Sequence, residues 1–455
     1  MQVTSDKGLS SLSPEAKRKI MARFSERQGV DDKAGRTDTA PAAPAGRQGQ
    51  IPESHYRPDQ FSAYKQIEMH RLIGEHANLS SPFFKVHDGV AADTTVVDGR
   101  ELLNFSSYNY LGINGDRRVG AAAVAAIERF GTSASASRLV SGERPPHRAL
   151  EEALADFHGT TDALAFVSGH ATNIAAIGTL MGPHDLILHD RLIHNSVLVG
   201  AQMTGASRML FPHNDWRAVD AILFEQRDRY EKILICVEGM YSMDGDICPL
   251  ERFVEVKKRH KALLMVDEAH SVGVLGATGR GIGEHTGVVG ADVDIWMGTL
   301  SKTFSACGGY IAGEAALIEL LRYSAPGFVY SVGMSPPIAA AALESLRILL
   351  MEPERVALLQ RNGAHCLAAM RARNLDTAFS QGFGVVPVVT GSSMLAVRMS
   401  NTLFDRGISV APIIYPAVEE GRARLRFFMS SAHKPEQIEE AADAVALAMA
   451  TLSKQ

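Results

Sequence analysis

Two groups of reactive side chains stand directly after short apolar runs of this 455-residue sequence. The run ALLMV is followed by a carboxylate and an imidazole, and the run DIWM by two hydroxyls and an amine: Asp267, His270, Thr299, Ser301 and Lys302. The separation between the acid and the lysine corresponds to about one strand, helix and strand. The two groups are therefore expected to lie close together in the fold.

These residue types match what pyridoxal 5′-phosphate (PLP) requires from a protein. A lysine forms the covalent imine, an acid keeps the pyridine nitrogen protonated, and hydroxyls with backbone N–H groups bind the phosphate. A single lysine is more often a solvated surface residue, and a single loop acid is more often a helix cap or half of an ion pair. The occurrence of both after neighbouring apolar runs favours a cofactor site.

The elements that must position these residues alternate in type along the chain. Short runs that are apolar on both faces occur between longer helical stretches, at 163–167, 185–189, 232–238, 262–268 and 294–298. Such runs are typical of strands in a sheet covered by helices on both faces. We predict an α/β large domain with a doubly wound, mostly parallel sheet, whose ligands bind at the carboxyl ends of the strands.

The pattern changes after residue 344. It predicts one long helix over 344–373, short strands at VVPVV, MLAVRM and ARLRFFM, and a terminal amphipathic helix from Pro435. These elements indicate a smaller α+β domain. The predicted organisation is an N-terminal helix and linker, an N-terminal segment, a large PLP-binding domain and a small C-terminal domain, over 1–60, 61–105, 106–344 and 345–455.

The N-terminal region has a different composition. Residues 29–60 are rich in Ala, Pro, Gly and charge, so they predict a flexible linker. Ahead of them, Ser13 as N-cap and Pro14 at the first helical position predict a helix at about 14–27. A tethered helix is typical of a docking element in a larger multienzyme, and a tail with residual helicity is the alternative.

Composition limits the possible partners. Hydrophobic residues make up 46% and charged residues 21% of the chain, and the net charge is −5, so neither nucleic acid nor a membrane surface is an expected partner. No stretch reaches the roughly 20 apolar residues of a membrane span, and no signal sequence is recognisable. The four cysteines are scattered without metal-ligand spacing. We therefore expect a cytoplasmic protein with reduced thiols and no metal site.

The order of the short motifs resembles the α-oxoamine synthase family of fold-type I PLP enzymes, from about residue 80 to the C-terminus. The motifs are YNYLG at 108–112, SRLVSG at 137–142, FVSGHATN at 166–173, HNS at 194–196, HND at 213–215, EGMYSMDGD at 238–246, VDEAHSVGVLG at 266–276, GTLSK at 298–302 and ARLRF at 423–427. The resemblance implies a homodimer with its active site at the interface. It also implies a decarboxylative condensation of a small amino acid with an acyl thioester, giving an α-amino ketone.

The resemblance implies roles for individual residues. Lys302 forms the imine with PLP, and Asp267 pairs with the ring nitrogen. His194 stacks on the ring face and handles protons. His270 and Ser242 lie near the ring oxygen O3′. The phosphate is implied to contact the hydroxyls and helix-opening N–H groups of Thr299, Ser301, Ser168, Gly169 and His170.

The substrate residues implied by the family are two arginines and an amide. A bidentate guanidinium suits the amino-acid carboxylate, and Arg426 is the first choice. Arg424 faces the same side of the predicted strand, so it stays an alternative. Asn109, in the YNYLG motif, is expected near the substrate.

Two segments depart from the family pattern. GTSASASR at 131–138 stands where relatives have a Gly-rich stretch, so the acyl channel is expected to differ. In FVYSVGMSPP at 328–337, Ser331 and Gly333 compete for the position of a Thr that reaches the phosphate of the partner subunit.

Other functions remain open at this point. Another fold-type I PLP enzyme, such as an aminotransferase or a lyase, would use Lys302 and Asp267 equally well. A non-catalytic partner subunit is disfavoured because Lys302 is present. A dinucleotide site at GRGIG, 279–283, is weaker because no acid follows at the required spacing. The sequence selects neither the amino acid nor the acyl chain, nor coenzyme A over an acyl carrier protein as the thiol.

Overall fold

The protein is described by a computed structural model, which covers residues 51–77 and 79–452. The chain divides into two compact units, Met1–Ser81 and Pro82–Gln455. The described part of the first unit contains two 3₁₀ turns and one helix: η1 (Glu53–His55), η2 (Pro58–Gln60) and α2 (Ser62–His76). The helix predicted at 14–27 and most of the predicted linker lie outside the described residues.

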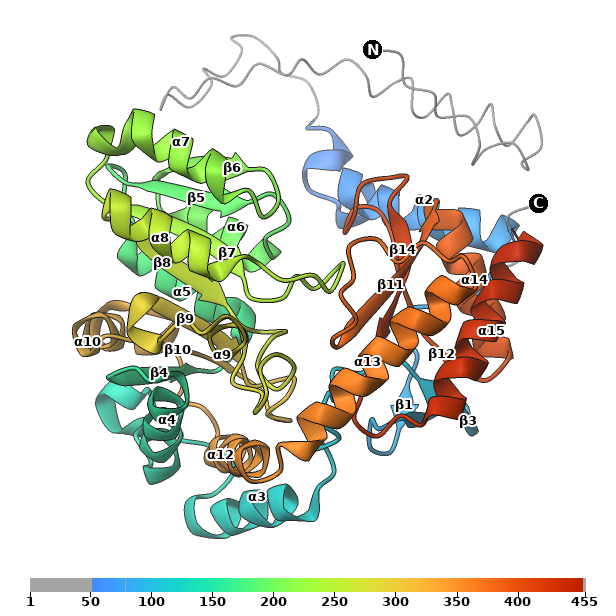
Figure 1. The fold of residues 1–455 in the computed structure, drawn as a ribbon, viewed down its shortest axis with the longest axis horizontal. Coiled ribbons are helices and arrows are strands. Elements are labelled where there is room, and N and C mark those ends of the chain that lie inside the picture. The colour runs from blue at the N-terminus through green and yellow to red at the C-terminus, as the bar shows by residue number, and fades with distance from the viewer. Residues whose placement is uncertain (1–50, 78, 453–455) are drawn as a thin grey trace. The chain divides into compact units, whose positions relative to one another are not determined.

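The second unit contains a seven-stranded sheet with the order β4-β10-β9-β8-β7-β5-β6 (Figure 1). Its strands are β4 (Asp162–Phe166), β5 (Leu186–Asp190), β6 (Ser207–Phe211), β7 (Ile233–Glu238), β8 (Leu263–Asp267), β9 (Ile295–Thr299) and β10 (Gly309–Gly313). Strand β10 is antiparallel to both neighbours, and the other neighbouring pairs are parallel. The five predicted strands are confirmed, and β6 and β10 were not predicted.

Helices cover both faces of this sheet, as the doubly wound prediction requires. Leu186 and Leu188 of β5 belong to one hydrophobic cluster, and Ile187 between them belongs to a second. Because alternate side chains of a strand point to opposite faces, both faces are buried. The helices are α4 (Pro145–His158), α5 (Gly169–Leu180), α6 (Asn195–Met203), α7 (Trp216–Gln226), α8 (Leu250–His260), α9 (Ile282–Thr286), α10 (Ala315–Ser324) and α11 (Pro326–Val329).

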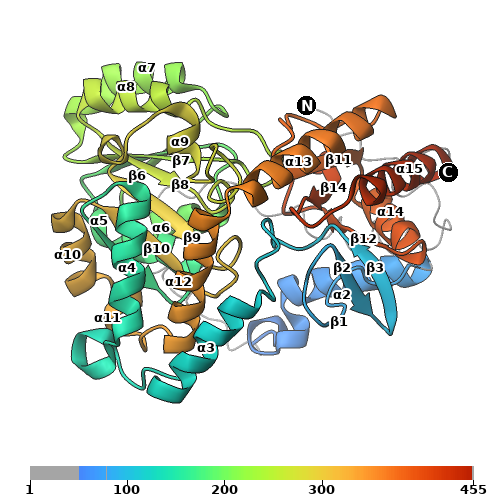
Figure 2. The ribbon, with the colours of Figure 1, turned by 60° about the horizontal axis from the view of Figure 1, so that its bottom comes forward.

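The single long helix predicted over 344–373 is wrong. The segment forms the end of α12 (Pro336–Met351) and all of α13 (Glu354–Ala372). Pro353 lies between the two helices; it has no backbone N–H to donate and its ring obstructs the preceding turn, which explains the break. Helix α12 packs against α3 (Arg117–Phe130) (Figure 2).

The C-terminal elements form an antiparallel sheet of β11 (Val385–Gly391), β14 (Ala423–Phe428) and β13 (Ala411–Ile413). The strand predicted at MLAVRM is wrong, because these residues lie in helix α14 (Ser393–Asp405). The buried residues of α14 are Ala396, Met399, Ser400 and Leu403, which is helical spacing. The terminal helix is confirmed as α15 (Pro435–Leu452).

A third sheet joins the start of the second unit to its C-terminal elements. It consists of β1 (His87–Asp88), β2 (Thr94–Val97), β3 (Arg100–Asn104) and β12 (Ile408–Ser409), and β3 pairs with β12 in parallel. The predicted boundary at 344/345 falls inside α12, and the predicted domain limits stay predictions. None of the helices in the described part of the chain combines the length and apolar character that a membrane span requires.

Candidate active site

The ends of several central strands enclose a cavity of about 290 Å³. Nine of the ten residues predicted to bind the cofactor line it, and only Ser242 is missing from the lining: Ser168, Gly169, His170, His194, Asp267, His270, Thr299, Ser301 and Lys302. Strands β8 and β9 run parallel as neighbours, so their carboxyl ends carry Asp267 and Lys302 to the same edge of the sheet. The cavity is therefore a site in which one ligand contacts both residues.

The amine of Lys302 lies in this cavity among charged groups. Burial lowers the pKa of Lys302 to about 8, against the opposing effect of Asp267 and Glu238. A lysine with this pKa is partly neutral near physiological pH, which an imine-forming amine requires.

Asp267 is held by donors from two directions. Its carboxylate accepts hydrogen bonds from Asn173 Nδ2 and from the backbone N–H of Ala269, both at 2.9 Å. Asn173 Nδ2 also donates to Ser196 Oγ at 2.8 Å. These contacts fix the orientation of the Asp267 carboxylate.

A second buried acid stands beside Asp267. Glu238 is in register with Asp267 across β7 and β8 and lines the same cavity. Burial raises the pKa of Glu238 well above its usual range, with the charge of Asp267 as the next cause. Glu238 is therefore the neutral member of the pair, and its Oε1 atom has no partner. Sequence reasoning missed Glu238 and Asn173, although Glu238 begins and Asn173 ends a motif that it had singled out.

Two of the three imidazoles that line the cavity, those of His194 and His270, are in their neutral forms. His194 caps helix α6, and its Nδ1 atom is 2.7 Å from Ser196 Oγ. His270 Nδ1 is 2.7 Å from the hydroxyl of Tyr110. Burial lowers the pKa of both histidines, that of His270 well below its usual range. Burial also raises the pKa of Tyr110, so the phenol keeps its proton for His270.

Part of the cavity lining fits an anion. Helix α5 begins at Gly169, and Ser168 caps it by accepting from the N–H of Ala171 at 3.3 Å. Thr299 Oγ1 and Ser301 Oγ are 2.7 Å apart beside this helix end. A Cβ atom at Gly169 would lie only 2.7 Å from Thr299 Oγ1, so the close approach requires glycine. Helix N–H groups with two hydroxyls fit a phosphate.

These groups together fit PLP: an amine, an acid, neutral imidazoles and a phosphate cradle. In the described part of the chain, no group of histidine, cysteine and acidic side chains could hold a metal ion.

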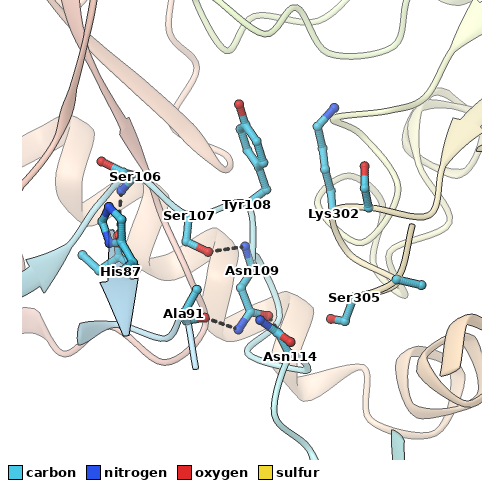
Figure 3. A pocket seen from close by; sticks show the side chains of 12 residues that line it. His87, Ala91, Ser106, Ser107, Tyr108, Asn109, Asn114, Lys302 and Ser305 are labelled. Carbon is cyan, nitrogen blue, oxygen red and sulfur yellow. Dashed lines mark hydrogen bonds between the residues drawn. The ribbon is translucent and has the colours of Figure 1, made fainter. Parts of the chain in front are cut away.

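A second cavity of about 400 Å³ adjoins Lys302 (Figure 3). Asn109 lines it, and its place near the substrate stays a prediction. However, its side chain donates to the carbonyl of Ala91 at 2.9 Å and accepts from the N–H of Asn114 at 3.1 Å. The amide of Asn109 therefore holds the wall of this cavity together.

The two candidate arginines differ in their contacts. Arg424 Nη1 donates to Asp244 Oδ1 at 2.5 Å and to the carbonyl of Met243 at 3.1 Å, in a buried ion pair. Arg426 Nη1 donates to the carbonyl of Ser242 at 3.0 Å, and the buried Nε atom of Arg426 has no partner. Arg426 thus keeps a free donor, whereas Arg424 is occupied.

The two segments that depart from the family pattern, 131–138 and 328–337, contact each other. The N–H of Gly333 donates to the carbonyl of Ala136 at 3.0 Å, and the hydroxyl of Ser137 donates to the carbonyl of Val329 at 2.7 Å. A Cβ atom at Gly333 would lie 2.8 Å from Cγ of Arg138. Close packing against 131–138 therefore explains the glycine at 333.

Comparisons with known proteins agree with this site. The model of the aminotransferase class I and II family matches residues 100–445. The 8-amino-7-oxononanoate synthase of Fervidobacterium nodosum is 40% identical over 76% of this chain and 88% of its own length. That of Geobacter sulfurreducens is 40% identical over 79% and 91%.

Solved structures give the same result. Serine palmitoyltransferase of Sphingomonas wittichii has a TM-score of 0.82 and 30% identity, over 86% of this chain and 98% of its own. The 8-amino-7-oxononanoate synthase of Francisella tularensis has a TM-score of 0.66 and 27% identity, over 76% and 97%.

The fold and the site thus define a PLP-dependent transferase of fold type I, and the chain belongs to the aminotransferase class I and II family. Within it, the chain is an α-oxoamine synthase, an acyltransferase that condenses an amino acid with an acyl thioester. The synthase prediction is confirmed over the aminotransferase, lyase and dinucleotide-binding alternatives.

Proposed function

We propose that this chain condenses a small amino acid with an acyl thioester, releases CO₂ and gives an α-amino ketone, with Lys302 holding the cofactor. The observation that carries the proposal is the cavity that joins Lys302 and the donor-supported carboxylate of Asp267 at adjacent strand ends. Bound PLP supplies an electron-withdrawing ring that stabilises negative charge at the amino-acid Cα.

Lys302 has two tasks in this proposal. Its amine holds the cofactor covalently, and when the amino acid has taken that place it removes the Cα proton. A pKa of about 8 suits a base that works near neutral pH. Asp267 keeps the ring nitrogen cationic, and Asn173 keeps Asp267 in place.

The imidazoles orient the reacting groups. His194, which lines the cavity, would stack on the ring face of bound PLP and contact the substrate carboxylate. With the phenol of Tyr110 donating to Nδ1 of His270, the proton of His270 lies on Nε2 and is available to the ring oxygen. Ser242 supports the site through its backbone, because its N–H donates to Glu238 and its carbonyl accepts from Arg426.

The two substrates require separate places. The free donor of Arg426 supports its assignment to the amino-acid carboxylate, and Arg424 supports the loop beneath it. The second cavity beside Lys302 gives room for the thioester. Glycine, alanine and serine are the candidate amino acids. Coenzyme A and an acyl carrier protein are the candidate thiols, and the predicted N-terminal helix and linker favour a carrier protein within a polyketide-type assembly.

We also propose a cytoplasmic homodimer with the active site at its interface. The adjoining segments 131–142 and 328–335 support this, since four of their apolar side chains are exposed: Leu139, Val140, Tyr330 and Val332 are 46%, 81%, 86% and 52% exposed. A second subunit would cover them and shield the reacting groups from water. Ser331 is the proposed contact to the partner's phosphate, because Gly333 has no side chain to offer.

The test is a product balance. The holoenzyme is incubated with each candidate amino acid and with acyl-CoA or acyl-carrier-protein thioesters. We expect thiol and CO₂ in equal amounts, an α-amino ketone by mass spectrometry, and none of these from Lys302→Ala. Thiol release without CO₂ or amino ketone from every pair would refute the condensation.

A further inference from the structure

A half-buried histidine, His213, lies outside the lining of the cofactor cavity and connects three adjacent strand ends. In the sheet order β7-β5-β6, Asp190 is the last residue of β5, His213 follows β6, and Asp246 lies in the loop after β7. His213 Nδ1 is 2.9 Å from Asp190 Oδ1, and His213 Nε2 is 2.7 Å from Asp246 Oδ2. One imidazole thus spans from the turn after β5 to the loop after β7.

The geometry requires His213 to carry a positive charge. Ionised carboxylate oxygens only accept hydrogen bonds, so an imidazole that bonds two of them must donate from both nitrogens. Burial opposes the charge, but hydrogen bonds to Asp190 and Asp246 raise the pKa of His213 to about 10. The ring of Tyr241 packs edge-on against the imidazole of His213, with the ring centroids 4.4 Å apart. It covers the bridge that Asp190, His213 and Asp246 form.

Asp246, at one end of this bridge, belongs to the 242–246 loop, which supports both Arg424 and Arg426. Within this loop the N–H of Tyr241 donates to the carbonyl of Asp246 at 2.8 Å, which closes its base. Arg426 rests on the carbonyl of Ser242 at 3.0 Å, and Arg424 on that of Met243 at 3.1 Å. The position of the guanidinium of Arg426 thus depends on a loop whose base is held by His213, together with the neighbouring Asn214, whose Nδ2 atom donates to Asp246 Oδ2 at 3.0 Å.

We propose that His213 is a positioning residue for the amino-acid carboxylate: by cross-linking Asp190 to Asp246 it holds the 242–246 loop on which Arg426 rests. The inference relies on the proposed role of Arg426. It predicts that loosening the bridge weakens recognition of the carboxylate while cofactor binding and the chemical step persist.

The experiment compares three variants of the holoenzyme. Asp246→Asn removes the charge at the loop end and leaves the pair of Asp190 and His213. Arg426→Lys changes the proposed carboxylate ligand directly. Asp220→Asn is the matched control, because Asp220 Oδ1 is 2.7 Å from His260 Nε2 in a similar pair between α7 and α8. For each variant kcat and KM are measured, together with the affinity for the amino acid and for its uncharged amide from the cofactor absorbance.

We expect Asp246→Asn to raise the KM for the amino acid about tenfold with less than about a threefold change in kcat. Its affinity for the amide should stay at the wild-type level, as should its cofactor content. Asp246→Glu should recover most of the loss, and Asp220→Asn should behave as wild type. A merely structural role would lower the affinities for acid and amide together.

Other outcomes would refute either the positioning role of His213 or the proposed role of Arg426. If Arg426→Lys abolishes discrimination between acid and amide but Asp246→Asn leaves it intact, the positioning role is wrong. If Arg426→Lys itself leaves discrimination intact, the proposed role of Arg426 fails and this inference fails with it. If Asp246→Asn loses the cofactor, the variant His213→Gln, which keeps one hydrogen-bond donor, is measured in its place. Unchanged discrimination between acid and amide in His213→Gln refutes the positioning role.

Discussion

At the scale of single residues, side chains of the same type in the site differ in their properties because their surroundings differ. Asp267 accepts two hydrogen bonds, whereas Glu238 beside it is buried with little support, so its pKa is raised well above the usual range and it is neutral. A cation on the cofactor ring therefore has one counter-ion and not two. The same division separates Arg424, which is paired, from Arg426, which keeps a free donor.

The lowered pKa of Lys302 makes cofactor uptake depend on pH. Only the neutral amine attacks an aldehyde, and burial sets its pKa at about 8. The uptake rate of apoenzyme should rise about tenfold per pH unit below that value and level off above it. Stopped-flow absorbance between pH 6 and 10 measures this rate. An inflection near 10.5, the ordinary lysine value, would contradict the burial effect.

Substitutions of Arg424 and Arg426 should have different effects on stability and on the KM for the amino acid. Arg424→Ala leaves the carboxylate of Asp244 buried without a partner, which is expected to lower the free energy of unfolding by about 3–5 kcal/mol. Arg426→Lys should change stability by less than about 1 kcal/mol and raise the KM for the amino acid. Denaturant unfolding and steady-state kinetics separate these effects, and the reverse pattern would exchange the two roles.

At the scale of elements, strand ends and helix starts converge on one cavity. The sheet brings Asp267 and Lys302 together, and helix α5 points its first N–H groups at the same place. The loop after β7 then meets the arginines of β14. The site is therefore shared between the seven-stranded sheet and the C-terminal sheet.

Two glycines of helix α5 provide a matched test of the phosphate cradle. A methyl group at Gly169 would lie 2.7 Å from Thr299 Oγ1, whereas one at Gly178 meets nothing within 4 Å. Gly169→Ala should weaken PLP binding more than about tenfold, and Gly178→Ala should leave it unchanged while stabilising the helix by about 0.5–1 kcal/mol. Cofactor titration of the apo forms measures both. Equal affinities would show that the close approach is not required.

The bridge at His213 should contribute to stability in a defined pH window. Its pKa is raised from 6.5 to about 10 by Asp190 and Asp246, despite burial. A raised pKa stabilises the folded state fully below 6.5, and the contribution is lost as pH rises toward 10. The difference in unfolding free energy between wild type and His213→Gln should therefore shrink over this range. A constant difference would mean that packing against Tyr241 dominates.

At the scale of the whole molecule, the proposed function requires two chains. Sedimentation should give a mass about twice the 49.0 kDa of one chain. Val140→Asp, on the exposed apolar segment, should shift the protein toward monomer and lower activity in parallel, because a charge cannot be buried there without a partner. A fully active monomer would contradict the shared active site.

The local pattern of the sequence was sufficient for the cofactor chemistry and the centre of the fold. The five predicted strands are apolar on both faces, Asp267 lies at the end of one of them and Lys302 lies shortly after the next, so spacing along the chain places them at one edge. Strand β6 was missed because most of its residues are exposed, and β10 because glycines frame it. The order of nine motifs identified the family.

Only the tertiary structure decided how the site is supported. Arg424 and Asp244, Asn173 and Asp267, and Asp190, His213 and Asp246 meet from distant parts of the chain. The helix at MLAVRM likewise depends on which residues the neighbouring sheet buries. Periodicity and motif spacing describe neighbours along the chain, whereas hydrogen-bond partners and burial depend on packing between segments far apart in sequence.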